Sequence, residues 1–394
     1  MTSSKPQFVG KKVKLGELCE ICSGGTPKRS VAEYWKDGTI PWVKIGDMSE
    51  KYVSSTEERI TDAGFNNSSV KMLEPGTLLY SIFASIGAVS ILKIPATTNQ
   101  AIAGLKIKDD SLDRDFLYHY LKSRESISKS SGRGAAQNNI NLTILRNMQV
   151  TLPSIEIQRS IVRNLEMISN QVTIAESHLM DLDALVKSRF VEIFGDFACY
   201  ETKPLIKCVD CIEAGKSPKC LAFSRKMAEP GVLKLSAISS GVYCENENKA
   251  LPRSVSLTID KVVHANDILL SRKNTPELVG RSVLVKHTDG NIMFPDIIFR
   301  MHPLPPINAM YLSYLLAGPL LHSIQSLAHG SAKSMSNIPK SELAKLSIPI
   351  PALNLQNEFA AFVAQVDKSR FVAQQQIEKL QMLYDSLAQE YFGD

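Results

Sequence analysis

Apolar residues recur at alternating spacings of four and three in two long stretches of this 394-residue chain, residues 154–196 and 352–394. Equivalent positions differ by 198 without a gap, and both stretches end in Phe-Gly-Asp. This spacing is typical of the a/d seam of paired α-helices, about 50 Å long for some 36 residues. The pattern alone leaves a parallel or an antiparallel pairing open. Nine seam positions are predicted to bind a partner: Ile161, Leu165, Ile168, Leu179, Leu182, Phe359, Val363, Ile377 and Leu380.

Weaker similarities join the segments that precede these helices. The run 76–81 resembles 266–271, and the run 116–121 resembles 311–316. Each segment mixes short β-like runs with Gly, Pro and Asn turns, and each contains one clear helical pattern, at Asp115–Arg124 and Ala309–Gln325. We therefore predict an internally repeated α/β (α+β) chain with domains at 1–150 and 197–348 and helices at 151–196 and 349–394.

Composition and charge allow a soluble chain with a nucleic-acid partner but do not require one. The net charge is +5, which is compatible with binding to nucleic acid. The first ten residues lack the apolar segment of a secretory signal, so a cytoplasmic location is expected. Pro75–Leu92 carries no charge, but its glycines and serines favour two buried strands and a turn over a membrane span.

Cysteine spacing raises the possibility of a zinc site. Cys19 and Cys22 form one Cys-x-x-Cys pair, and Cys208 and Cys211 form another. The two pairs are out of register by one position when the domains are aligned, which favours buried thiols over metal ligands.

Motifs for catalysis are incomplete or missing. Gly215-Lys216-Ser217 resembles the end of a phosphate-binding loop, but Asp210 stands where that motif needs its first glycine. Pro295-Asp296 lacks the following acidic and lysine residues of a restriction-type nuclease. We find no methyltransferase or dinucleotide-binding motif. The sequence therefore favours a non-catalytic chain.

Basic and amide side chains gather instead in the irregular segments of both domains. These residue types contact DNA phosphates and base edges. A solvated polar loop is the alternative for any one of them, but the pattern is present in both domains. The predicted DNA-binding residues are Lys28, Arg29, Lys36, Lys44, Arg133, Asn138, Lys219, Arg225, Lys234, Arg272, Lys273, Lys333 and Asn337.

Three features together resemble the specificity subunit of type I restriction-modification systems. They are the opening segment 15–47 with its Ser-Gly-Gly-Thr-Pro run, the Leu-Pro or Ile-Pro helix entry with Gln158 or Gln356, and the duplicated helix ending in Phe-Gly-Asp. The resemblance covers essentially the whole chain. The second domain departs from the opening pattern at 214–218, which suits a domain that reads a different DNA sequence.

The resemblance implies two target recognition domains and an antiparallel coiled coil with a pseudo-twofold repeat. Each domain would read one half of a bipartite double-stranded DNA site, and the helices would fix the spacer and dock two methyltransferase subunits. S-adenosylmethionine would bind those subunits, while ATP and Mg²⁺ would bind motor-nuclease subunits. This chain would carry no cofactor, metal or membrane segment. The alternative is a coiled-coil scaffold whose domains bind proteins or small molecules.

Overall fold

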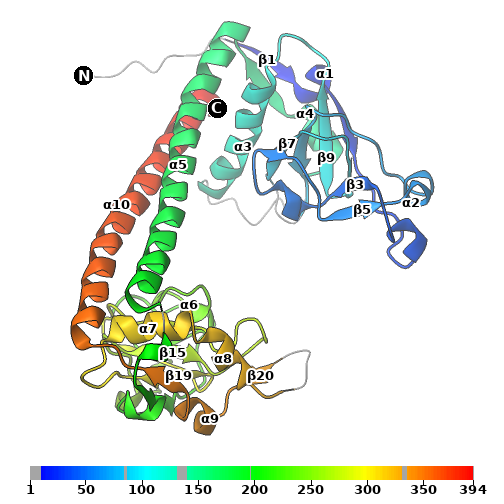
Figure 1. Cartoon of the computed structure of the whole chain (residues 1–394). Helices are drawn as coiled ribbons and strands as arrows, with labels where there is room; N and C mark the ends of the chain where they lie inside the picture. The colour runs from blue at the N-terminus through cyan, green and yellow to red at the C-terminus, as the bar shows by residue number, and fades with distance from the viewer. Residues whose placement is uncertain (1–9, 84–86, 131–139, 196, 331–334, 394) are drawn as a thin grey trace, which may run out of the picture. The chain divides into compact units, whose positions relative to one another are not determined.

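The two stretches with the heptad pattern form the longest elements of the computed structural model (Figure 1). Helix α5 spans Ile155–Phe194 and helix α10 spans Leu353–Phe392, 40 residues each. At about 1.5 Å per residue, each helix is about 60 Å long. The structure describes residues 10–83, 87–130, 140–195, 197–330 and 335–393, without the side chains of 125–130.

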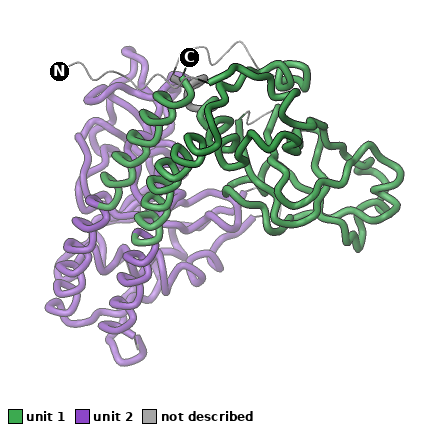
Figure 2. Tube along the Cα trace, turned by 90° about the horizontal axis from the view of Figure 1, so that it is seen from above, with its two compact units in different colours: residues 1–178, 373–394 green, residues 179–372 purple. Residues whose placement is uncertain are grey.

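The described chain divides into two units, which Figure 2 colours separately. Unit 1 comprises Met1–His178 and Ala373–Asp394, and unit 2 comprises Leu179–Val372. Each unit therefore contains one domain together with part of each long helix. This division differs from the predicted segments, which gave each helix a segment of its own.

The long helices pair in the antiparallel sense within both units. In unit 1, Asn164 near the start of α5 donates a 3.1 Å hydrogen bond to the phenol oxygen of Tyr391, near the end of α10. In unit 2, Arg189 near the end of α5 forms a 2.6 Å ion pair with Glu358, near the start of α10. The expected antiparallel pairing is therefore confirmed.

Three sheets build the domain of unit 1. Strands β1 and β10 pair at the two ends of the domain, a five-stranded sheet has the order β2-β9-β6-β7-β4, and a small sheet has the order β5-β3-β8. The strand bounds are β1 Lys11–Lys14, β2 Cys19–Ser23, β3 Ile40–Val43, β4 Tyr52–Val53, β5 Glu58–Ile60, β6 Leu78–Ser81, β7 Val89–Leu92, β8 Thr97–Thr98, β9 Ile102–Ile107 and β10 Gln149–Leu152. The helices are α1 Leu15–Leu18, α2 Asp62–Asn66, α3 Arg114–Ser130 and α4 Leu142–Asn147, with 3₁₀ turns at Ala32–Tyr34 and Ile45–Met48.

Unit 2 repeats this plan with shorter strands. Strands β11 and β21 pair at the ends of the domain, β12-β19-β15-β17 form a sheet equivalent to part of the five-stranded one, and β14-β13-β18 matches β5-β3-β8 in both strand senses. A further ribbon pairs β16 with β20. The strand bounds are β11 Thr202–Pro204, β12 Glu213–Ala214, β13 Gly231–Leu233, β14 Asn248–Ala250, β15 Ile268–Ser271, β16 Lys273–Asn274, β17 Ser282–Leu284, β18 Ile292–Met293, β19 Ile298–Met301, β20 Ser336–Asn337 and β21 Ser347–Pro349. The helices are α6 Ser236–Ser239, α7 Ala309–Ala317, α8 Leu321–Ser326 and α9 Lys340–Ala344, with 3₁₀ turns at Phe197–Cys199, Leu205–Lys207 and Ile259–Lys261.

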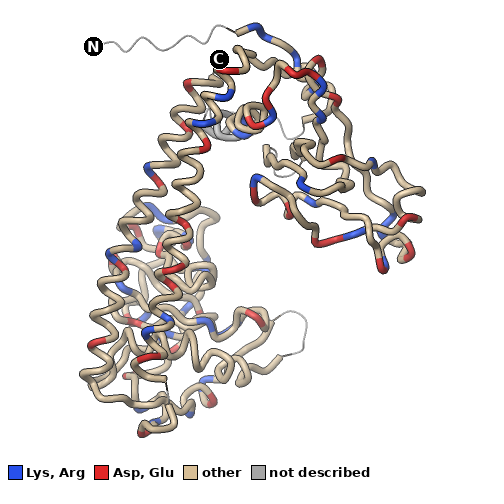
Figure 3. Tube along the Cα trace, turned by 45° about the horizontal axis from the view of Figure 1, so that its top comes forward, with Lys and Arg blue, Asp and Glu red and all other residues tan. Residues whose placement is uncertain are grey.

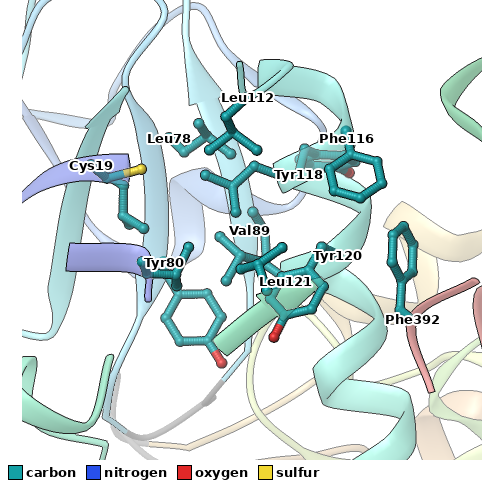
Figure 4. Packing of buried hydrophobic residues seen from close by; sticks show 14 of the residues in the cluster. Cys19, Leu78, Tyr80, Val89, Leu112, Phe116, Tyr118, Tyr120, Leu121 and Phe392 are labelled. Carbon is teal, nitrogen blue, oxygen red and sulfur yellow. The ribbon is translucent and has the colours of Figure 1, made fainter. Parts of the chain in front are cut away.

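The main core of each unit joins its domain to its part of the helix pair. In unit 1, Phe392 of α10 lies beside Phe116 and Tyr120 of α3, with ring centroids 5.4 and 5.8 Å apart (Figure 4). In unit 2, Phe359 of α10 packs against Phe190 of α5 at 5.1 Å. Because these aromatic residues are almost fully buried, the domains and helices share one hydrophobic core in each unit.

Two sequence-based expectations can be compared directly with the elements. Pro75–Leu92 contains β6 and β7, which pair antiparallel as buried strands, so the prediction of two buried strands is confirmed, while 84–86 between them lie outside the described residues. The single helix expected at Ala309–Gln325 is wrong, because α7 ends at Ala317 and α8 begins at Leu321. Pro319 has no backbone N–H to continue the helix, and Gly318 occupies the C-cap. Among the residues described, no helix is long and apolar enough to cross a membrane.

Candidate nucleic-acid interface

In unit 1 two tryptophans anchor residues 25–37, which include the predicted DNA-binding residues Lys28, Arg29 and Lys36. The indole N–H of Trp42, on β3, donates a 3.0 Å hydrogen bond to the carbonyl of Gly25. The indole N–H of Trp35 donates at 3.2 Å to the carbonyl of Lys28. Lys28 and Lys36 are both exposed. The segment is therefore irregular but fixed, and it presents two long basic side chains to solvent.

Arg29 and Lys44 lie beside this segment, but acidic side chains already neutralise them. The guanidinium of Arg29 lies 3.8 Å from the ring centroid of Trp35 and forms an ion pair with Glu58. Lys44 contacts Glu57 at 2.8 Å and Glu58 at 2.9 Å. The hydrogen bond from Arg29 lowers the pKa of the Glu58 carboxyl. DNA contacts by Arg29 and Lys44 would therefore require that these cations exchange their carboxylate partners for groups on the DNA.

In unit 2 the three basic residues predicted before and after β13 have different surroundings. Lys219 is exposed, and Lys234 lies 3.5 Å from Glu247. The side chain of Arg225 is only 5% exposed and forms a 2.8 Å ion pair with Asp289. Arg225 also donates a hydrogen bond to the carbonyl of Glu229 at 2.8 Å. The prediction that Arg225 reaches a phosphate does not fit this burial, which gives the residue a structural role.

The ribbon of β16 and β20 brings three of the predicted residues together. Lys273 lies directly opposite Asn337, and Arg272 precedes β16. The Arg272 guanidinium lies 5.3 Å from the ring centroid of Phe299, and the ammonium of Lys273 lies 4.0 Å from the carboxylate of Asp296. The side-chain oxygen of Asn337 is buried and has no hydrogen-bond partner among the described residues. This ribbon is therefore the polar cluster in unit 2 that best fits base and phosphate contacts.

Three predicted residues, Arg133, Asn138 and Lys333, lie outside the described residues, in 131–139 and 331–334.

The nine seam residues predicted to bind a partner are buried or partly buried by other residues of the same chain. Ile161, Leu165, Ile168, Phe359 and Val363 are at most 8% exposed. Leu182 and Leu380 are partly buried against the same cores, and Leu179 and Ile377 are half-buried. A buried seam cannot also form the surface of another subunit. We therefore correct this assignment for the five buried residues, which hold the helices to each other and to the domains, whereas it stays a prediction for Leu179, Leu182, Ile377 and Leu380.

Sequence reasoning missed a set of exposed apolar residues on the same helices. Ile174 and Leu383 are 47% and 48% exposed in unit 1, and Val372 and Leu185 are 62% and 48% exposed in unit 2. Ile174 and Val372 differ by 198 positions, as do Leu185 and Leu383. Both units therefore present the same pair of apolar positions, at heptad positions c and g, which flank the seam on one side. Their recurrence at the repeat offset could have revealed them.

Charged side chains and thiols complete the description of these surfaces. Figure 3 shows Lys and Arg interspersed with Asp and Glu along α5 and α10. Burial raises the pKa of Cys19 to about 12, which suppresses thiolate formation. All seven cysteines are free. Within the described ranges, no three His, Cys, Asp or Glu side chains are grouped so that they could hold a metal ion.

A family model described as "Type I restriction modification DNA specificity domain" matches residues 10–181. These residues are therefore similar to type I DNA specificity domains. The matched residues include the whole domain of unit 1 and α5 as far as Asp181.

The chain is also similar in sequence to specificity subunits of type I restriction enzymes. The chain is 28% identical over 199 residues to the type I restriction enzyme MjaIX specificity subunit of Methanocaldococcus jannaschii, a match covering 49% of this chain and 45% of that protein. It is 29% identical over 158 residues to the EcoR124I/EcoR124II specificity subunit of Escherichia coli, covering 39% of each. The chain thus spans less than half the length of these curated relatives.

One solved structure shares the fold along the full chain. It is described as "Structural basis underlying complex assembly and conformational transition of the type I R-M system", with a TM-score of 0.58, 17% identity and 99% coverage of both chains. The expected resemblance to type I specificity subunits and the expected fold class are both confirmed.

Proposed function

We propose that this chain is the sequence-specific DNA-binding subunit of a type I restriction enzyme. The observation that carries the proposal is the repeat of unit 1 in unit 2, with equivalent main sheets, an equivalent helix junction and different polar residues. Repeated domains with different surface residues suit the reading of two different DNA sequences. Each domain would read one half of a bipartite site in double-stranded DNA.

Within each domain, different residues would serve phosphate and base contacts. Lys28, Lys36 and Lys219 are exposed on irregular segments, where a flexible ammonium can meet phosphate without a fixed rotamer. Asn337 is held on the β16–β20 ribbon by backbone hydrogen bonds to His329. A rigidly held amide opposite Lys273 is the better candidate for a base edge, because base reading needs fixed geometry.

The exposed apolar pairs on the long helices would dock two methyltransferase subunits. Ile174 with Leu383, and Val372 with Leu185, occupy equivalent positions in the two units. Two equivalent surfaces suit two copies of one partner, and exposed apolar side chains gain free energy when a partner covers them. Motor-nuclease subunits would then join the assembly through the methyltransferase subunits.

The chain itself would perform no chemistry. The proposal assigns S-adenosylmethionine to the methyltransferase subunits, and ATP and Mg²⁺ to the motor-nuclease subunits. The incomplete nucleotide-binding and nuclease motifs of the sequence support this division.

DNA selection tests the proposed function. The tagged full chain, purified from its native host with the subunits that it retains, is incubated with randomised duplexes, and the bound duplexes are sequenced. We expect two short conserved blocks separated by an unread spacer of fixed length. Enrichment of one continuous block would contradict a bipartite reader. No enrichment of any sequence, in a sample that retains other proteins, would favour the scaffold alternative.

A further inference from the structure

The two glutamines of the helix entries occupy equivalent buried joints. Gln158 is the fourth residue of α5 and Gln356 is the fourth residue of α10. Both glutamines are fully buried. Buried amides need partners for both the oxygen and the nitrogen, and here they have them.

In unit 1, Gln158 links three segments. Its side-chain oxygen accepts a 2.8 Å hydrogen bond from the backbone N–H of Asp113. Its nitrogen donates to the carbonyls of Ser111 at 2.7 Å and Pro153 at 2.9 Å. The Asp113 carboxylate in turn accepts hydrogen bonds from the backbone N–H groups of Asp115 and Phe116, at the start of α3. Gln158 therefore binds the residue that caps α3.

Unit 2 contains the same joint with different neighbours. The side-chain oxygen of Gln356 accepts a 2.8 Å hydrogen bond from the backbone N–H of Asn308, and its nitrogen donates to the carbonyl of Pro351 at 2.8 Å. Asn308 is the N-cap of α7, and its side-chain oxygen accepts from the backbone N–H of Met310. Each glutamine thus forms hydrogen bonds with the residue that caps the domain helix of its unit and with the proline that precedes its own long helix.

We propose that Gln158 and Gln356 are positioning residues that set the direction in which each long helix leaves its domain. Only a side chain of this length with one acceptor and one donor end can join the cap N–H to the proline carbonyl. A carboxylate could not donate, and an aliphatic side chain would leave a buried N–H and a buried carbonyl unpaired.

This inference rests on the proposed function, in which the helices set the spacer. If the joint fixes the helix direction, it also determines how strongly the enzyme prefers DNA with the native spacer length over DNA with a shorter or longer spacer. Loss of the joint should leave the bases read in each half-site unchanged, while duplexes with spacers one base pair too short or too long become tolerated.

The test measures binding of the assembled enzyme to duplexes with both selected half-sites and spacers of native length, one shorter and one longer. Gln158→Met keeps the chain length but removes both hydrogen-bonding ends. We expect its preference for the native spacer to fall about tenfold, the scale of one or two buried hydrogen bonds. Ile157→Val is the matched control, because Ile157 precedes Gln158 on α5 and is 39% exposed, and its preference should equal that of the wild type.

Gln158→Glu supplies a second measurement if the methionine variant folds poorly. A protonated carboxyl has one donor and one acceptor and reproduces the joint, whereas the carboxylate cannot donate. The site is buried beside the Asp113 carboxylate, and both features raise the pKa of the new carboxyl. Spacer preference should therefore be weak at pH 8 and return toward the wild-type value near pH 5.5, with the wild type measured at both pH values.

The outcomes separate the inference from the proposed function. If the variants lose affinity equally at all three spacers, Gln158 is structural only and the inference is overturned. If the wild type itself shows no spacer preference, the proposed function fails and the inference fails with it. Gln356→Met, with Leu353→Met as its control because Leu353 is 44% exposed at the start of α10, should repeat the result from the other unit.

Discussion

His119 of α3 and Tyr384 of α10 share a buried hydrogen bond of 2.8 Å between the imidazole Nδ1 and the phenol oxygen. The other imidazole nitrogen lies 3.9 Å from the Glu166 carboxylate of α5. Because the Glu166 carboxylate lies on that side, we assign the imidazole proton to Nε2, so that the phenol donates to Nδ1. The imidazole thus joins α3 to α10 by a hydrogen bond and lies near the Glu166 carboxylate of α5, all within unit 1.

Tyr384→Phe should lower the stability of unit 1 by about 1–2 kcal/mol, because it leaves the buried Nδ1 without its donor. Trp35 and Trp42 are the two tryptophans of the chain, and both lie in unit 1, so urea unfolding followed by their fluorescence reports on this unit. Tyr391→Phe is the control, since its exposed hydrogen bond to Asn164 can be replaced by water. Equal effects of the two substitutions would show that burial of the pair is unimportant.

Acidification should weaken unit 1 through the same imidazole. Burial, aided by Lys51 and Lys122, lowers the pKa of His119 to about 3, against about 6.5 in an unfolded chain. Below pH 6.5 the unfolded state therefore binds a proton that the folded state excludes, and stability falls as the pH drops toward 3. Between pH 7.5 and 5.5 we expect a loss of about 1.3 kcal/mol from this residue.

The control for the pH effect is His119→Gln, measured by the same fluorescence in urea. The substitution removes the titrating group, so the difference in stability between pH 7.5 and 5.5 should shrink by about 1.3 kcal/mol. An unchanged pH dependence would assign the effect to other residues.

Substitution of Arg225 should affect folding and not DNA affinity directly. Arg225→Ala leaves Asp289 and Glu245 without their cation. We expect a local loss of about 2 kcal/mol, less than for a fully buried pair because both carboxylates are partly exposed. Hydrogen exchange measured by mass spectrometry should accelerate in 226–233 and 287–293. Lys219→Ala should leave that exchange unchanged, and protection equal in both variants would contradict the structural role of Arg225.

Removal of the Glu58 charge should strengthen DNA binding in general. Glu58→Gln frees Arg29 and Lys44 from an acidic partner, so affinity for cognate and mismatched duplexes should rise alike and depend more steeply on salt. Lys28→Ala should act in the opposite direction, weakening all sequences and reducing the salt slope by about one charge. Both are measured with the assembled enzyme at several salt concentrations. A Glu58→Gln effect confined to one base pair would instead indicate direct base reading by this carboxylate.

The helices and several strands followed from the sequence because their signals are local and repeated. The gap-free offset of 198 between Gln158 and Gln356 located both helix entries, and the uncharged run from Pro75 marked two buried strands. The helix break at Gly318 also has a local sequence signal, the Gly318-Pro319 pair. The apolar residues on both sides of this pair favoured the prediction of one continuous helix.

The candidate site was harder to predict because several of its basic side chains form ion pairs with acidic side chains that are distant in the sequence. Arg225 looked like a free cation until the fold brought Asp289 to it, 64 positions later in the chain. Arg29 was likewise paired with Glu58. The seam residues were assigned to partner binding because periodicity identifies a buried face but not what covers it.

Independent reading by the two domains is the central claim, and an exchange of one domain tests it most directly. Residues 203–347 are replaced by the matching domain of a relative with a different target, and the DNA methylation pattern of cells carrying the hybrid enzyme is sequenced. We predict a new bipartite site in which one half is unchanged and the other is that of the relative. A folded, assembled hybrid whose two half-sites both changed, or both vanished, would contradict the account.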